Sequence, residues 1–290
     1  MKVHHFFDQA TFTLTYIVYD EKSKDCVVID PVLDFDYASG YLSDESASAL
    51  HDFLQKNGLK PYYFLETHVH ADHLSSAHFL KSRYYHDAKV AISRHITTVQ
   101  KTFSEIFSLQ GSVKTDGSQF DTLLEENKTY QAGTIEFSVI ETPGHTPACL
   151  TFQFGDNLFT GDCQFMPDSG TGRCDFPGGS ANTLYNSIAK KLYSLSNSLK
   201  IFVGHDYQPN GRELAFQTTV GEQKSKNIHI KADTSEEEFV KFRTARDQTL
   251  NAPKLLYPSL QINMNAGVLP DADAKGNRFL KVPLKTSKID

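Results

Sequence analysis

Hydrophobic and polar residues form short, distinct patterns along the first part of the chain. Residues 12–20 alternate with a period of two, which is typical of a strand, and residues 26–31 form an apolar strand that ends at a proline. Residues 46–58 instead carry apolar positions at helical spacing and close with a glycine. We therefore expect strands and helices to be mixed from the start.

The same patterns predict the remaining elements. Strands are expected over 62–67 and 89–93, and helices from Leu74 to about Arg83 and over 97–109. A strand-rich block follows over 128–133, 134–144, 149–162 and 200–206, with a hairpin at Gly155–Asp156. Helical spacing covers 181–196, 213–227 and 236–250, and we expect the segment after Asn251 to be irregular.

The order strands, helices, strands, helices predicts two β-sheets packed together with helices outside them. No repeat of about 20–50 residues and no low-complexity linker divides the chain. We expect residues 1–250 to form one domain and residues 251–290 to be a C-terminal extension that packs on it.

Composition excludes some classes of function as defaults. The chain has 290 residues, of which 39% are hydrophobic and 22% charged, with a net charge of -6 and no basic cluster. We therefore expect neither nucleic-acid nor membrane binding, because both usually need concentrated positive charge or about 18 consecutive apolar residues. The N-terminus resembles no signal peptide, and four scattered cysteines form no CxxC motif, so a reducing cytoplasm is expected.

The stretch THVHADH, residues 67–73, concentrates His68, His70, Asp72 and His73 where a strand ends and a helix is expected. His68 and His70 project to the same side if the backbone stays extended. Imidazole nitrogens and carboxylate oxygens are ligands for zinc, iron or manganese. This spacing favours a metal site over isolated surface histidines.

Three later candidates follow predicted strands in the same way. His145 lies in TPGHTP, Asp162 in FTGD and His205 in VGHDY, each beside a glycine that lets the backbone turn sharply. With the first motif they make seven nitrogen or oxygen ligand candidates and no thiolate. Structural zinc sites favour cysteine and are closed at four ligands, so we expect an open, reactive site.

Together, HxHxDH, TPGHT, TGD and GHD resemble the metallo-β-lactamase fold superfamily, over about Phe12 to Tyr207. The resemblance implies an αββα sandwich of two mixed sheets flanked by helices, with residues 1–250 as the catalytic domain. It also implies two metal positions. One would be held by His68, His70 and His145, the other by Asp72, His73 and His205, with Asp162 bridging them.

The segment MPDSGTGRCDFPGGSANTLYNSI, residues 166–188, narrows the resemblance to the persulfide dioxygenases, relatives of glyoxalase II that carry one iron. The resemblance implies Fe(II), one per chain, on His68, His145 and Asp162, a set typical of non-haem oxygenases. It implies oxidation of glutathione persulfide with O2 and water to sulfite and glutathione. His70, Asp72, His73 and His205 would then orient ligands, bond to water or move protons.

Arg173 matches a family arginine near the substrate and would pair with a glutathione carboxylate, unless it forms a structural salt bridge in its loop. Tyr207 is a second candidate for contact with substrate. Cys163 and Cys174 lie near the expected chemistry; Cys174 departs from the threonine of many mitochondrial members. Buried, inert thiols are favoured over redox-active ones.

Two alternatives stay open. All seven ligand types also suit a glyoxalase II-like hydrolase of glutathione thioesters with two zincs and a bridging hydroxide. A persulfide-binding sensor with little turnover is the other, and the sequence leaves a homodimer open. The preference for iron rests on the resemblance, because affinity generally favours zinc over Fe(II).

Overall fold

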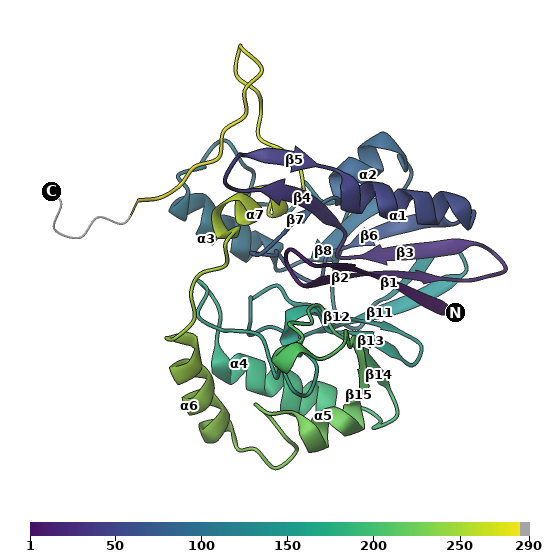
Figure 1. The fold of residues 1–290 in the computed structure, drawn as a ribbon, viewed down its shortest axis with the longest axis vertical. Coiled ribbons are helices and arrows are strands. Elements are labelled where there is room, and N and C mark those ends of the chain that lie inside the picture. Colours follow the sequence, from purple (N-terminus) through teal and green to yellow (C-terminus); the bar gives the residue numbers. More distant parts are fainter. Residues whose placement is uncertain (285–290) are drawn as a thin grey trace, which may run out of the picture.

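The computed structural model describes residues 1–284 and has the expected αββα architecture. Two six-stranded sheets face each other, with α1, α2 and α3 outside the first sheet and α4, α5 and α6 outside the second (Figure 1). Each sheet mixes parallel and antiparallel pairs. The predicted sandwich of two mixed sheets is confirmed.

The first sheet has the strand order β1-β2-β3-β6-β8-β9. Its strands are β1 (Lys2–Asp8), β2 (Thr13–Tyr19), β3 (Asp25–Ile29), β6 (Lys60–Leu65), β8 (Lys89–Ser93) and β9 (Thr122–Leu124). A small adjoining sheet contains β4 (Val32–Asp36), β5 (Tyr41–Ser43) and β7 (Leu74–Ser75). The alternation in β2 sends Tyr16 and Val18 into the core between the sheets and Ile17 into the core beneath the outer helices.

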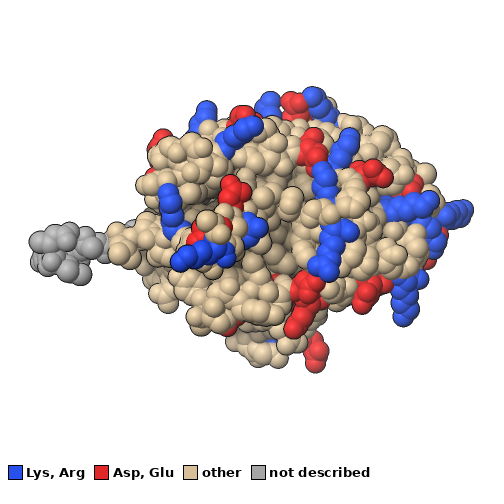
Figure 2. Space-filling view, turned by 90° about the horizontal axis from the view of Figure 1, so that it is seen from above, with Lys and Arg blue, Asp and Glu red and all other residues tan. Residues whose placement is uncertain are grey.

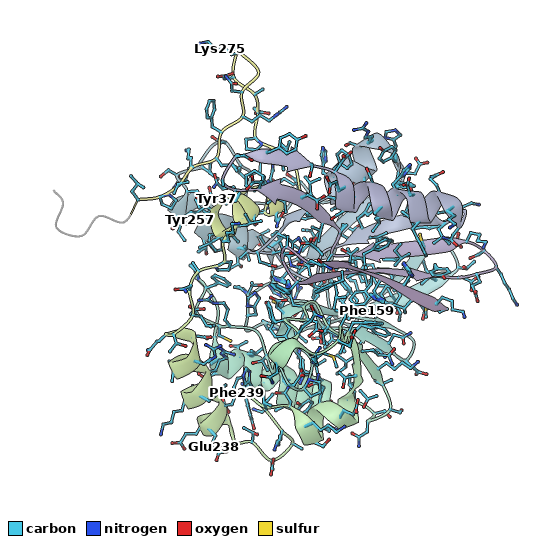
Figure 3. The ribbon with its side chains drawn as sticks, viewed as in Figure 1. Tyr37, Phe159, Glu238, Phe239, Tyr257 and Lys275 are labelled. Carbon is cyan, nitrogen blue, oxygen red and sulfur yellow. The ribbon has the colours of Figure 1, made fainter. Side chains whose placement is uncertain are left out.

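The second sheet has the order β10-β11-β12-β13-β14-β15. Its strands are β10 (Thr129–Ala132), β11 (Ile135–Glu141), β12 (Leu150–Phe154), β13 (Asn157–Phe159), β14 (Lys200–Phe202) and β15 (Gln217–Thr219). The predicted hairpin joins β12 to β13, which pair antiparallel. Phe159 lies between the two layers, in a core of aliphatic and aromatic side chains (Figure 3).

Seven α-helices occur within residues 1–284: α1 (Glu45–Lys56), α2 (Ala77–Arg83), α3 (Ile96–Ile106), α4 (Ala181–Tyr185), α5 (Val220–Lys226), α6 (Glu236–Asp247) and α7 (Leu256–Asn263). A π-helical turn, Asn186–Lys191, and a 3-10 turn, Leu192–Ser194, continue α4. Other 3-10 turns are Gly161–Cys163 and Pro209–Gly211. None of these helices has the length and apolar character that crossing a bilayer requires.

Three expectations about local structure were wrong. Residues 213–227 are not one helix: β15 pairs with the edge of β14, and α5 begins only after Thr219, whose hydroxyl caps it by accepting from the Glu222 amide. The helix expected from Leu74 begins at Ala77, because Leu74 and Ser75 pair with β4.

The segment after Asn251 is not wholly irregular, since α7 occupies Leu256–Asn263. Residues 258–263 are all buried, so the helix has no polar face and leaves no periodic signal. In Figure 1 the chain runs from α6, beside the second sheet, to α7, beside the first. The C-terminal segment therefore touches both layers.

Candidate metal centre

Four loops that follow strands meet at one edge of the sandwich. They carry the seven ligand candidates: His68, His70, Asp72 and His73 after β6, His145 after β11, Asp162 after β13 and His205 after β14. Backbone hydrogen bonds tie the loops to neighbouring strands, because the Leu14 amide donates to the Gly204 carbonyl and the Leu150 amide to the Thr67 carbonyl, each at 2.8 Å. The expected convergence of these distant segments is observed.

His68, His145 and Asp162, here called the trio, form a compact set of possible ligands. One ligand atom from each lies within 4.8 Å of the others. The Nε2 atoms of His68 and His145 lie 3.9 and 3.7 Å from Asp162 Oδ2. The three side chains are at most 10% exposed, so little water competes for these atoms.

The hydrogen bonds of both trio histidines fix which nitrogen is free. The Thr67 hydroxyl donates its one hydrogen to Asp30 Oδ2 at 2.8 Å, so it accepts from His68 Nδ1 at 3.0 Å. His145 Nδ1 donates to the Arg173 carbonyl at 2.7 Å. Each ring therefore carries a hydrogen on Nδ1 and directs Nε2 toward Asp162, which leaves Nε2 as the nitrogen that would bind a metal.

Asp72, His73 and His205 are here called the second group. His73 is held as the trio histidines are, because its Nδ1 donates to the Leu74 carbonyl at 3.1 Å, but His205 is held differently. His205 Nε2 lies 3.3 Å from Asp72 Oδ2 and also 3.3 Å from Asp162 Oδ1. Burial opposes protonation of His205, but these two carboxylates raise its pKa. The Asp72 side chain is 25% exposed and is the most open of the seven. His205 therefore shares its contacts between Asp72 of the second group and Asp162 of the trio.

His70 connects the site to two buried carboxylates that the sequence analysis did not identify. Its Nε2 lies 3.0 Å from Asp30 Oδ1 and 3.6 Å from Glu66 Oε2. Burial and the Asp30 charge raise the pKa of Glu66 to about 8, so Glu66 is protonated at neutral pH. Asp30 directly after a buried strand and Glu66 directly before the HxHxDH motif were the available signals.

Buried nitrogens and oxygens without a protein partner mark the centre as a metal site. Among residues 1–284, the buried side-chain atoms that accept or donate no hydrogen bond include His68 Nε2, His70 Nδ1, His73 Nε2, Asp162 Oδ1 and His205 Nε2. Such atoms cost free energy unless something satisfies them. A cation at the centre would satisfy them, so the residues present fit a metal.

Two glycines allow the loops to approach this closely. A Cβ on Gly161 would lie 2.5 Å from Thr67 Oγ1, and Gly161 has a φ of +48°. A Cβ on Gly172 would lie 2.1 Å from the Asp162 carbonyl oxygen. A larger residue at position 161 would collide with Thr67, and one at position 172 would collide with the Asp162 carbonyl, so both positions require glycine.

A pocket of about 980 Å³ opens beside the trio. Its lining includes His145, Asp162, Arg173, Phe176, Tyr207, Arg246 and Lys254. The Arg173 guanidinium lies between Asp175 and the Asn251 carbonyl, with hydrogen bonds of 2.6 to 2.7 Å. Tyr207 is 48% exposed, and its ring stacks on that of His205. Arg246, in α6, and Lys254, after that helix, were not predicted, because both lie far along the chain from the ligand motifs.

Both cysteines near the site are buried thiols. Cys163 and Cys174 are 0% and 7% exposed and form no disulfide. Burial raises the pKa of each thiol above its ordinary value, which keeps it protonated and unreactive. This geometry agrees with the inert thiols that the sequence analysis favoured.

The fold and the site together define the class. The chain belongs to the metallo-beta-lactamase superfamily, whose family model matches residues 9–205. Lys, Arg, Asp and Glu side chains are interspersed on the face shown in Figure 2, where neither sign of charge covers the whole face.

Three relatives narrow the comparison. The chain is 45% identical to glyoxylase B2 of Dictyostelium discoideum over 288 residues, which cover 99% of this chain and 98% of the relative. It is 30% identical to mitochondrial persulfide dioxygenase ETHE1 of Homo sapiens over 264 residues, or 90% and 87%. The crystal structure of ETHE1 from Myxococcus xanthus matches with a TM-score of 0.73 and 28% identity, and covers 92% of this chain and 100% of that one.

Proposed function

We propose that this protein is an iron-dependent persulfide dioxygenase. Its substrates would be glutathione persulfide, O2 and water, and its products glutathione, sulfite and two protons. The terminal sulfur takes up three oxygen atoms, two from O2 and one from water, and the sulfur–sulfur bond breaks with a proton returning to the glutathione thiol. The similarity to the human persulfide dioxygenase ETHE1 and to the structure of ETHE1 from Myxococcus xanthus supports this assignment.

The observation that carries the proposal is that the trio histidines and His205 have different hydrogen-bond and ion-pair partners. The trio offers one carboxylate and two imidazoles whose Nδ1 atoms already donate hydrogen bonds, whereas His205 Nε2 contacts Asp72 and Asp162. Two histidines and one carboxylate are the ligand set of non-haem Fe(II) oxygenases. When bound, Fe(II) would mediate electron transfer to O2 from the persulfide sulfur, which is oxidised to sulfite.

The residues around the trio would serve orientation and proton handling. Thr67 and the Arg173 carbonyl hold the trio rings, while Asp30 holds His70. Tyr207 lines the pocket, where it would donate its hydroxyl to the substrate. A site that is closed except on the pocket side would keep bulk water from competing with the persulfide.

The pocket suits a tripeptide with negatively charged ends. A volume of about 980 Å³ is at the upper end of the ~300–1,000 Å³ typical of small-molecule sites. Arg173, Arg246 and Lys254 place cations on its lining. Arg173 would bind a glutathione carboxylate in exchange for part of its pairing with Asp175, so Arg173→Ala should raise KM for the persulfide about tenfold and leave kcat nearly unchanged.

The test is elemental analysis of freshly purified protein together with an oxygen-electrode assay. We expect about one iron per chain, O2 uptake on addition of glutathione persulfide, and sulfite in equal amount. An iron-loaded protein that consumes no O2 contradicts the proposal. An Arg173→Ala variant with unchanged KM and kcat would contradict only the substrate role of Arg173; Arg94→Ala, on the surface, is the control.

A second candidate function is hydrolysis of glutathione thioesters by two zinc ions. All seven ligand candidates gather at one edge of the sandwich, and the 45% identical relative is named glyoxylase B2. A hydroxide between two metals would attack the thioester carbonyl in such an enzyme. Two zincs per chain with turnover of S-lactoylglutathione would establish this function instead.

A further inference from the structure

Helix α6 lies behind the metal centre and outside the part of the chain that the family model matches. The matched residues end at 205, whereas α6 spans Glu236–Asp247. Its buried face is a stripe spaced by four residues: Phe239, Arg243 and Asp247 are 0%, 2% and 4% exposed. Phe239 points into the protein and Glu238 away from it (Figure 3). Two of the three buried positions are therefore charged.

The charged pair binds the backbone of one segment, Thr171–Cys174. Arg243 donates to the Thr171 carbonyl at 3.1 Å, and Asp247 Oδ2 accepts from the Cys174 amide at 2.9 Å. Arg243 and Asp247 also pair with each other at 2.6 Å. The two ends of the segment are thus held from the same side by one ion pair.

The other side of this segment touches two metal-ligand candidates. The Arg173 carbonyl accepts from His145 Nδ1 at 2.7 Å, which leaves Nε2 directed at Asp162. Gly172 packs against the Asp162 carbonyl so closely that a Cβ would lie 2.1 Å from it. The segment Thr171–Cys174 therefore lies between α6 and the trio and contacts both.

Stability alone does not account for a buried ion pair at these positions. Well-packed apolar residues of similar size often stabilise a protein as well as a buried pair does, or better. What apolar residues cannot do is bind a carbonyl and an amide at fixed positions. We propose that Arg243 and Asp247 are positioning residues, which set the orientation of His145 and the place of Asp162 through the backbone of Thr171–Cys174.

The proposal goes beyond the reaction assigned above, because the trio needs the same placement for iron or for zinc. Its main test is the double variant Arg243→Leu/Asp247→Leu, which removes both bonds to the segment without leaving an unpaired charge. Partners of metal-binding histidines typically contribute about 10- to 100-fold to metal affinity. Because it leaves the Thr171 carbonyl and the Cys174 amide without these partners, the variant should melt below the wild-type protein. At a temperature where it is folded, it should bind metal about 10- to 100-fold more weakly in chelator competition.

A second readout uses the metal-free protein. Cys174 follows the segment's central residues and is buried, so looser packing should expose its thiol to an alkylating reagent. Alkylation at Cys174, located by mass spectrometry, should be at least about tenfold faster in the double variant, while Cys26, in β3, should react at its wild-type rate. The single variant Asp247→Asn keeps an acceptor for the Cys174 amide. It should therefore bind metal more tightly than the double variant, with most of the wild-type affinity.

The matched control is Lys241→Ala, an exposed position on the same helix, which should leave both readouts unchanged. Wild-type metal affinity and wild-type Cys174 alkylation in a folded double variant would overturn the proposal. If that variant does not fold, Arg243→Lys replaces it, since lysine keeps the charge but lacks the fork that reaches Asp247 and the Thr171 carbonyl together. Unchanged metal affinity in Arg243→Lys would overturn the proposal equally.

Discussion

The two halves of the metal centre present similar residue types in different states. In the trio, Thr67 and the Arg173 carbonyl fix the histidines, and every side chain is at most 10% exposed. In the second group, His205 contacts two carboxylates and Asp72 is 25% exposed. The comparison teaches that ligand-like residues are not equivalent: the Nε2 atoms of the trio histidines lie 3.7 to 3.9 Å from Asp162, whereas His205 Nε2 lies 3.3 Å from both Asp72 and Asp162.

The largest expected effect follows from removing a trio ligand. His145→Ala should abolish metal retention and O2 uptake, because the remaining two trio residues cannot hold an ion in a three-ligand site. Elemental analysis after gel filtration measures this directly. His86→Ala, a surface histidine, is the control. Full metal content in His145→Ala would contradict the prediction that the trio, rather than the second group, holds the metal.

Substitution in the second group should be milder. Asp72→Ala should keep about one metal per chain and lower kcat about 10- to 100-fold, because this carboxylate would act on protons or water rather than hold the ion. Metal content and kcat are measured on the same sample. If Asp72→Ala loses metal as completely as His145→Ala does, the two halves act as one dinuclear site.

Asn263 of α7 gives a way to loosen the second group alone. Its Nδ2 donates to the carbonyls of His70 and His73 at 2.9 and 2.7 Å, and its Oδ1 accepts from the Ser75 amide at 2.8 Å. Asn263→Ala leaves buried backbone groups unpaired and should lower the free energy of unfolding by about 1–3 kcal/mol in urea titrations.

In the same variant, hydrogen exchange should rise over residues 70–75 and stay unchanged over 171–174. Asn265→Ala is the control, because its side chain makes one 3.4 Å hydrogen bond, to the Val268 carbonyl. Faster exchange at 171–174 would show that the two loops are not supported separately.

The smallest effect concerns pH and the segment beside the trio. His229 Nδ1 accepts from the Thr171 amide at 2.9 Å, and burial together with Arg243 and Arg246 lowers the pKa of His229 to about 4. An unfolded histidine has a pKa of about 6.5, so the unfolded chain binds more protons between these values. This contribution is complete above about pH 6.5 and is lost as the pH falls toward 4.

The variant that tests this is His229→Asn, which keeps an acceptor but does not titrate. Its unfolding free energy should fall by about 1–3 kcal/mol less than that of the wild-type protein between pH 7 and pH 4.5. Parallel urea titrations at the two pH values give the difference. Identical pH dependence in the two proteins would exclude His229 as the acid-sensitive support of this segment.

The sequence predicted which residues form the site better than it predicted the hydrogen bonds and ion pairs that these residues make. HxHxDH and the glycine-flanked His145, Asp162 and His205 all follow strands, so strand ends alone indicated where they meet. Asp30 and Glu66 escaped notice because single carboxylates beside strands carry no spacing signal. Whether Arg173 is free or paired with Asp175 depends on tertiary contacts with Asn251, which no local pattern contains.

The part of the chain after β14 was the least predictable, for a physical reason. Helix α7 is buried on all sides and has no amphipathic period, and β15 forms because β14 offers an unpaired edge. Arg243 and Asp247 look like surface charges in a polar helix, and only the backbone of Thr171–Cys174 explains their burial. Tertiary contacts, rather than local preference, decide these elements.

The central claim is that one ion, held by the trio, carries out persulfide oxidation. Its most direct test is the ratio of O2 consumed to sulfite formed by protein whose metal content has been measured on the same sample. The account predicts about one iron per chain and equal amounts of O2 and sulfite. Two zincs per chain, no O2 uptake and rapid thioester hydrolysis would contradict it.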